Sequence, residues 1–136
     1  MADPLGGPGN VPFNFDGQSI TLTASPATAV TYTVPTGYSG RLNINECFSR
    51  VTTTVAADTT APTVTFTVGS DLIGTITYPD TTAANATVVP VPASGFRSGV
   101  ALAAGDTIVV AHTKAVDSSS AAGVATVHTS ISWGKG

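Results

Sequence analysis

The chain is built from short segments in which apolar residues alternate with Thr, Ser or Asn at a strict period of two. The clearest segment, residues 63–68, places Val64, Phe66 and Val68 on one side and three threonines on the other. Because successive side chains of a β-strand point to opposite faces, this pattern predicts a half-buried strand with a hydroxyl-bearing outer face. Apolar residues nowhere recur at the helical period of 3.6. The sequence therefore predicts an all-β fold.

Strand segments recur between turn signals along residues 18–136. The expected strands cover residues 18–24, 29–34, 40–51, 62–68, 71–78, 86–91, 99–102, 107–114 and 124–133. Gly69 and Ser70 predict a two-residue hairpin, because glycine reaches the positive φ values of such turns. Pro90 indicates an edge strand, since proline cannot donate a ladder hydrogen bond. The expected core contains Leu22, Leu42, Ile44, Val64, Phe66, Ile76, Val110 and Ile131.

Two long segments carry further expectations about the direction of their side chains. In residues 40–51, Leu42, Ile44 and Phe48 are expected on one side of a single strand. Residues 124–133 are expected to close the fold as one strand, and its inward side chains are Ala125, Val127, Ile131 and Trp133.

About eight regularly spaced strands without helices predict an antiparallel β-sandwich or barrel. An immunoglobulin-like sandwich of the antibody type has a buried cysteine, tryptophan, cysteine arrangement, which the lone Cys47 and the terminal Trp133 do not supply. Gly105 and Asp106 make a turn into the penultimate strand, as in a jelly roll. The sequence favours an antiparallel jelly-roll sandwich over an immunoglobulin-like one.

Residues 1–17 form a separate region that is rich in Gly and Pro and is expected to be an extended arm. Residues 18–136 are expected to form a single domain. Within the arm, Val11, Phe13 and Phe15 are apolar residues spaced by two, with Pro12 between the first pair. Two interpretations stay open for these residues. They close over the core of their own domain, or they lie across a neighbouring subunit as a strand-like contact. We take Val11, Pro12, Phe13 and Phe15 as candidate partner-binding residues.

Composition limits the classes of partner. Only 10% of the 136 residues are charged, against about 25% in an average soluble domain, and the formal net charge is -3. Five scattered basic residues speak against sequence-independent binding of nucleic acid, which needs clustered Lys and Arg. The first residues lack the pattern of a secretory signal, and an apolar run of about 18 residues does not occur, so we expect synthesis in the cytoplasm and no contact with a membrane.

The residue types used in catalysis are few and dispersed. His112 and His128 would bind a metal only if their strands paired in register, and solvent-facing or interface positions are the simpler expectation. Glu46, the sole glutamate, has no evident second carboxylate for glycoside hydrolysis and is expected to form a salt bridge in a strand. Cys47 cannot form an intrachain disulfide. We expect no enzymatic activity, no cofactor and no metal.

A family resemblance adds a function to this fold. A small acidic chain rich in Ala, Thr and Gly, with a Gly/Pro arm at residues 1–17, resembles the jelly-roll decoration or cement proteins of tailed-bacteriophage capsids. The segments that carry the likeness are residues 1–17, 34–40, 104–110 and 127–133. The turn at Gly105 and Asp106 is equally similar to trimeric jelly rolls of the tumour-necrosis and complement type.

The resemblance implies a structural protein of the virion, made in the host cytoplasm and bound to the capsid exterior. Its partners would be the major capsid protein and two further copies of itself, because low charge leaves a wide surface for a symmetric trimer interface. The alternative is a carbohydrate- or receptor-binding β-sandwich module of a phage or bacterial surface structure. That module would need an exposed aromatic platform, and Tyr32, Tyr38, Tyr78 and Trp133 are dispersed in the sequence.

Overall fold

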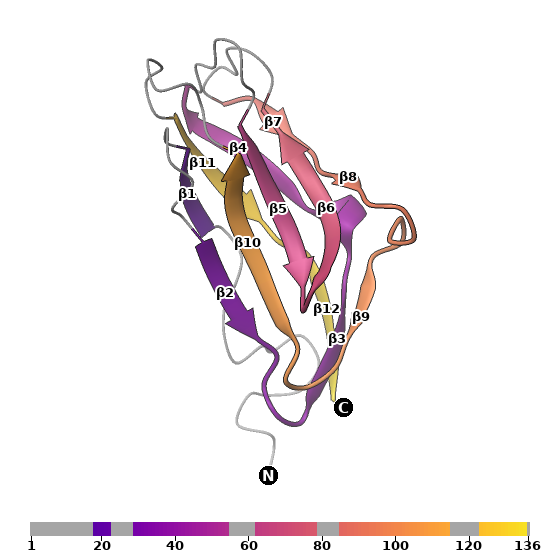
Figure 1. Cartoon of the computed structure of the whole chain (residues 1–136). Coiled ribbons are helices and arrows are strands. Elements are labelled where there is room, and N and C mark those ends of the chain that lie inside the picture. The colour runs from indigo at the N-terminus through magenta and orange to yellow at the C-terminus, as the bar shows by residue number, and fades with distance from the viewer. Residues whose placement is uncertain (1–17, 23–28, 55–61, 79–84, 115–122, 136) are drawn as a thin grey trace.

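The computed structural model describes residues 18–22, 29–54, 62–78, 85–114 and 123–135. These residues form β-strands joined by turns and one short 3-10 helix, η1 (Ile44–Glu46) (Figure 1). The strands are β1 (Gln18–Leu22), β2 (Ala29–Thr33), β3 (Tyr38–Leu42), β4 (Phe48–Thr53), β5 (Thr63–Val68), β6 (Asp71–Thr77), β7 (Thr87–Val88), β8 (Val91–Pro92), β9 (Val100–Leu102), β10 (Thr107–Lys114), β11 (Gly123–His128) and β12 (Ile131–Lys135). The expectation of a nearly all-β fold is confirmed.

The strands build three antiparallel sheets that stack as a sandwich. The five-stranded sheet has the order β2-β10-β5-β6-β8. The four-stranded sheet has the order β1-β11-β4-β7, and the three-stranded sheet has the order β12-β3-β9. The last two make up the opposite layer, because β11 leads into β12 and η1 joins β3 to β4. Figure 1 shows β10, β5 and β6 of the five-stranded sheet in front of this layer.

The strand pairs nest inside one another along the sequence. The hairpin β5–β6, which turns at Gly69 and Ser70 as expected, lies inside the pair β4–β7. The pairs β3–β9, β2–β10 and β1–β11 enclose it in turn. The nested pairs together form one long two-stranded ribbon. Two further pairs, β10–β5 and β11–β4, hold this ribbon in a rolled form with two layers. The outermost nested pair, β1 and β11, therefore lies in the four-stranded sheet, and β12 follows it into the three-stranded sheet.

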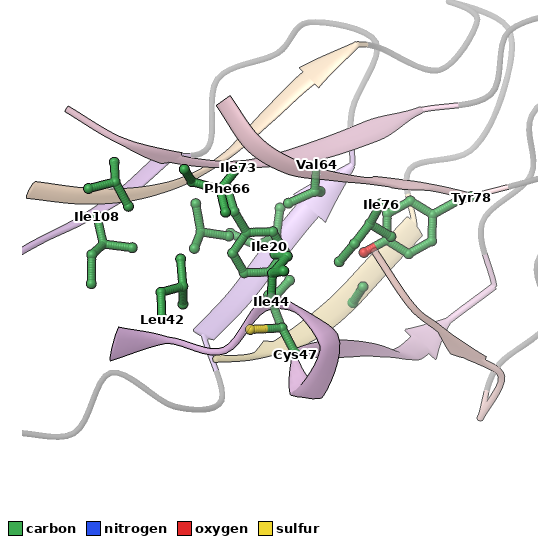
Figure 2. Packing of buried hydrophobic residues seen from close by; sticks show 14 of the residues in the cluster. Ile20, Leu42, Ile44, Cys47, Val64, Phe66, Ile73, Ile76, Tyr78 and Ile108 are labelled. Atoms are coloured by element: carbon green, nitrogen blue, oxygen red, sulfur yellow. The ribbon is translucent and has the colours of Figure 1, made fainter. Parts of the chain in front are cut away.

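The core fills the space between the layers. Seven of the eight core residues expected from the sequence are fully buried, and Ile131 is half-buried against the cluster. Figure 2 shows Ile20, Phe66 and Ile44 packed together between the strands. Because neighbouring core residues come from distant parts of the sequence, burial of this cluster holds the nested ribbon in its rolled form.

Residues 40–51 do not form the single strand that their pattern predicts. The helix η1 separates β3 from β4, and Cys47 ends it with a backbone hydrogen bond to the carbonyl of Ile44 (3.2 Å). This helical turn interrupts the alternation of inward and outward side chains. Ile44 is therefore buried, whereas Phe48 faces outward and is only half-buried. The expectation that Phe48 shares a side with Leu42 and Ile44 is wrong for this reason.

Two other segments are also divided where one strand was expected. Residues 124–133 split at Thr129 and Ser130 into β11 and β12, which belong to different sheets. Residues 86–91 contain β7, and β8 begins at Val91, so the segment crosses from one layer to the other around the buried Pro90. The edge position indicated by Pro90 is confirmed, because β7 and β8 are each the last strand of a sheet.

Candidate functional site

The two histidines do not come together. His112 lies on β10 in the five-stranded sheet, and His128 lies on β11 in the four-stranded sheet, so their strands do not pair. His112 is 3% exposed, which corrects the expectation of a solvent-facing or interface histidine. Within the described part of the chain, groups of three or more His, Cys, Asp or Glu that could hold a metal ion do not occur.

Glu46 belongs to η1 rather than to a strand. Its side chain is exposed, and the Ser130 hydroxyl donates a hydrogen bond to its carboxylate (3.1 Å). Asn43 donates a second bond across the same gap, from its amide nitrogen to the Ser132 hydroxyl (2.9 Å). These bonds fasten η1 to the junction between β11 and β12. The polar residues around Glu46 therefore have a structural function at the break in the layer.

The candidate residues of the N-terminal arm, Val11, Pro12, Phe13 and Phe15, lie outside the described residues. The described chain begins with β1 at Gln18, an edge strand that pairs only with β11.

The most distinctive surface of the described chain is the outer side of the five-stranded sheet. We call it the threonine face, and alternation with buried neighbours identifies its side chains. Its members are Thr31, Thr33, Thr63, Thr65, Thr67, Leu72, Thr75, Thr77, Val91, Thr107, Val109 and Ala111. Each of these side chains is uncharged, and each is exposed or half-buried.

The strand register aligns the threonine face in rows that cross the sheet. One row runs from Ala111 on β10 through Thr65 on β5 and Thr75 on β6 to Val91 on β8. A second row contains Thr31, Val109, Thr67 and Leu72. Because side chains that lie opposite one another on paired strands are in contact, each row is a continuous band of methyl and hydroxyl groups.

Three large apolar side chains of the described chain are exposed, and two of them lie in these rows, on β6 and β8. Leu72 is 45% exposed, Val91 is 71% exposed and Val89 is 61% exposed. Leu72 and Val91 belong to neighbouring rows of the threonine face, and Val89 precedes Val91 by two residues, outside β8. Single exposed apolar residues are ordinary, so Leu72 and Val91 mark an interaction surface only together with the uncharged threonines of the same rows.

The opposite layer presents a different chemistry. Its outer side carries the exposed Arg50 on β4 and Arg41 on β3, and the exposed Glu46 lies on η1 between them. The Arg41 guanidinium donates hydrogen bonds to the carbonyl and the hydroxyl of Ser98 (3.1 and 3.2 Å). Both signs of charge therefore occur on this layer, whereas the side chains named above for the threonine face are uncharged and the exposed Asp71 begins β6 next to Leu72.

The aromatic residues of the described chain do not form an exposed platform of several rings. Tyr78 is fully buried, and Tyr32 meets Trp133 edge-on at a centroid distance of 6.2 Å, beside the core cluster. A smaller outward pair consists of Phe48 and His128, whose rings stack at 4.5 Å on the outer side of the four-stranded sheet. Its members are 80 residues apart in the sequence, and only the β4–β11 register brings them together.

Sequence reasoning identified the outward threonines of residues 63–68 but not the surface to which they belong. The missing information is the strand order, because alternation gives the outward side chains of each strand without its neighbours. In the described part of the chain, no helix is long and apolar enough to cross a membrane. No protein-family model, no curated protein and no solved structure matches this chain.

Proposed function

We propose that the sandwich is a jelly roll. Two features support this topology: the nested pairs of the ribbon, and the orders β1-β11-β4-β7 and β2-β10-β5-β6 in its two main sheets. A jelly roll is a pair of Greek keys formed by such a rolled ribbon, and neighbours in each sheet then come from opposite ends of the chain. Jelly rolls occur in viral capsid and lectin domains, among others, so the topology alone does not choose a function.

We propose that the protein is a capsid decoration, or cement, protein that binds the outer shell of a tailed bacteriophage and stabilises it as a trimer. The observation that carries this proposal is the threonine face, whose side chains named above are uncharged and include the exposed Leu72 and Val91. Such a surface gains free energy when a partner covers it. A protein that buries surface only on the assembled shell stabilises that shell by mass action.

The N-terminal arm supplies the second contact in this proposal. Val11, Phe13 and Phe15 are anchors of the apolar and aromatic type that dominate interfaces, and the arm precedes the edge strand β1. An extended arm that lies along a neighbouring subunit or the shell adds main-chain hydrogen bonds and buries these rings.

Co-sedimentation with expanded capsid shells tests the proposal. The full-length chain should pellet with shells, and a chain that lacks residues 1–17 should keep its melting temperature but lose most of its attachment. Circular dichroism of both proteins provides the control for folding. A truncated chain that melts far lower while its folded fraction binds normally would place the arm in the core, and a full-length chain that never pellets would contradict the function.

A carbohydrate- or receptor-binding module is the second candidate, and one observation favours it. The stacked Phe48 and His128 lie on the same outer side of the four-stranded sheet as Arg50, one alternate position away on β4. An aromatic pair beside an arginine is a suitable contact for a sugar that carries an acid group. A glycan array that finds a ligand, with binding lost in Arg50→Ala, would support this module over the cement protein.

A further inference from the structure

We propose that the outer side of the four-stranded sheet binds a saccharide that carries a carboxylate, and that His128 strengthens this binding as the pH falls. The inference rests on the second candidate function and deepens it, because it names the class of ligand and a form of regulation for the same site. Its basis is the strand register, the stacked rings and the distribution of charge on this side of the sheet.

Four outward side chains form a compact group, which we call the arginine site. Its members are Phe48 and Arg50 on β4, and Thr126 and His128 on β11. In the strand register His128 lies opposite Phe48, and Thr126 lies opposite Arg50. The residue between the two members on each strand is fully buried, so all four side chains point away from the core. The ring pair and Arg50 are about 6.6 Å apart along the strand, which is two residues of rise, so one small ligand can contact both.

Arg50 is available to a ligand, whereas Arg41 is not. The Arg41 guanidinium donates hydrogen bonds to the carbonyl and the hydroxyl of Ser98 (3.1 and 3.2 Å), so it tethers the turn before β9. Arg50 is exposed, and within the described residues its guanidinium makes no hydrogen bond or ion pair. A guanidinium presents a planar fork of N–H donors that binds a carboxylate through two parallel hydrogen bonds. This fork favours a carboxylate as the charged group of the ligand.

The surroundings of Arg50 suit a sugar. Its row across the sheet contains Thr87 on β7, Thr126 on β11 and Ser19 on β1. Each of these hydroxyls can donate or accept a hydrogen bond, as the hydroxyls of a saccharide require. Phe48 is half-buried and offers an apolar ring against which the C–H face of a sugar can pack. The cation, the hydroxyls and the ring match the carboxylate, the hydroxyls and the apolar face of an acidic sugar.

His128 supplies the regulation. Its ring stacks on Phe48 at a centroid distance of 4.5 Å and an interplanar angle of 18°, which holds the imidazole inside the arginine site. Histidine is the only side chain whose charge ordinarily changes between pH 8 and pH 5. A positive charge on His128 adds to that of Arg50 and attracts the carboxylate of the ligand. Because exposed charges are screened by water, the gain in affinity is about two- to fivefold.

Two charged side chains of the described chain lie near His128 on other elements. Arg50 on β4 is the first. The second is Glu46 on η1, whose carboxylate accepts a hydrogen bond from Ser130 (3.1 Å), two residues after His128. The described residues of β1 and β7, the other strands of the sheet, carry no charge. Neither an arginine nor a glutamate ordinarily changes its charge between pH 8 and pH 5.5, so the change at the site comes from His128.

NMR titration of the full chain tests the inference, with trigalacturonic acid as the probe and maltotriose as a neutral trisaccharide of the same length. The acidic probe should shift the amide signals of Phe48, Arg50, Thr126 and His128. Its dissociation constant should be about two- to fivefold lower at pH 5.5 than at pH 8. Equal affinity for maltotriose would overturn the inference, and equal affinity for a sulfated trisaccharide would overturn the choice of a carboxylate.

Matched variants assign the effect to its residues. Arg50→Gln should weaken binding of the acidic probe by at least about tenfold, because the hydrogen bonds to its carboxylate are lost. Arg97→Gln removes the same charge from an exposed residue in the turn before β9 and should bind like wild type. His128→Gln should bind like wild type at pH 8 and show no gain at pH 5.5. Circular dichroism of each variant is the folding control.

The outcomes separate the inference from the function on which it rests. Equal affinity of wild type at both pH values, or a gain at pH 5.5 that persists in His128→Gln, would overturn regulation by His128. If Arg50→Gln still abolishes binding in that case, the carbohydrate-binding module stands without its regulation. A wild type that does not bind the acidic probe at either pH would contradict both.

Discussion

Phe66 is one of the largest fully buried side chains of the core. Its ring is fully buried among residues of both layers (Figure 2). Phe66→Ala removes that ring and leaves a cavity, so we expect it to lower the free energy of unfolding by about 3–5 kcal/mol. Thr67→Ala, on the threonine face of the same strand, is the matched control and should cost less than about 1 kcal/mol. Urea unfolding measures the free energy of unfolding of both variants. Similar losses would mean that β5 is shifted by one residue, so that its buried and exposed faces are exchanged.

Tyr78 makes stability depend on alkaline pH. Its hydroxyl lies 2.6 Å from the Ser49 hydroxyl, and the two share a buried hydrogen bond. Burial raises the pKa of Tyr78 from 10.0 to about 12, although the bond with Ser49 acts in the opposite direction. The folded state therefore keeps this proton between pH 10 and pH 12, whereas the unfolded chain releases it. The contribution of Tyr78 to the free energy of unfolding is fully present below pH 10, and it is lost as the pH rises towards 12.

The variant Tyr78→Phe tests this dependence. Wild type should lose on the order of 2 kcal/mol of stability through Tyr78 between pH 10 and pH 12, and the variant should lose less over that range. Below pH 9 the two proteins should show the same slope of stability with pH. Identical alkaline slopes, measured by urea unfolding at each pH, would show that Tyr78 is accessible to solvent in the folded state.

The turns between elements depend on two glycines with similar backbone angles and different surroundings. Gly37, between β2 and β3, has φ +88° and open space around it, and Gly99, before β9, has φ +87°. A Cβ at Gly99 would overlap the carbonyl oxygen of Leu42. Gly37→Ala should cost about 1–2 kcal/mol for the left-handed conformation alone. Gly99→Ala should cost clearly more and release β9 from β3, and equal melting temperatures would contradict this account.

Strands in which apolar and polar residues alternate without interruption could be predicted from the sequence. Segments in which a turn interrupts this alternation could not. Residues 63–68 form β5 with every expected side chain inward, because nothing in the strand disturbs its period of two. Residues 40–51 contain η1, which closes with a local hydrogen bond between Glu46 and Asn43 (2.9 Å). The apolar pattern through Ile44 and Phe48 carries no sign of that turn. The candidate surface was missed for a related reason, since a face of five strands depends on their order.

At the scale of the whole molecule, we propose that one layer of the sandwich contacts a partner and the other faces water. The threonine face, with the exposed Leu72 and Val91, is expected to be covered by a partner, while the layer with Arg41 and Arg50 stays in contact with water. We expect the free protein to be a small soluble oligomer that does not form shells or fibres alone. Electron microscopy of the protein by itself checks this, and filaments or closed particles would indicate a self-assembling subunit instead.

The most direct test of the central claim is the thermal stability of capsid shells with and without the bound protein. Expanded shells of the proposed capsid partner would be heated with a saturating amount of the chain, and their disruption followed by light scattering. We expect a higher disruption temperature in the presence of the chain, because binding only to intact shells stabilises them by mass action. Shells that bind the chain yet break at an unchanged temperature would contradict it.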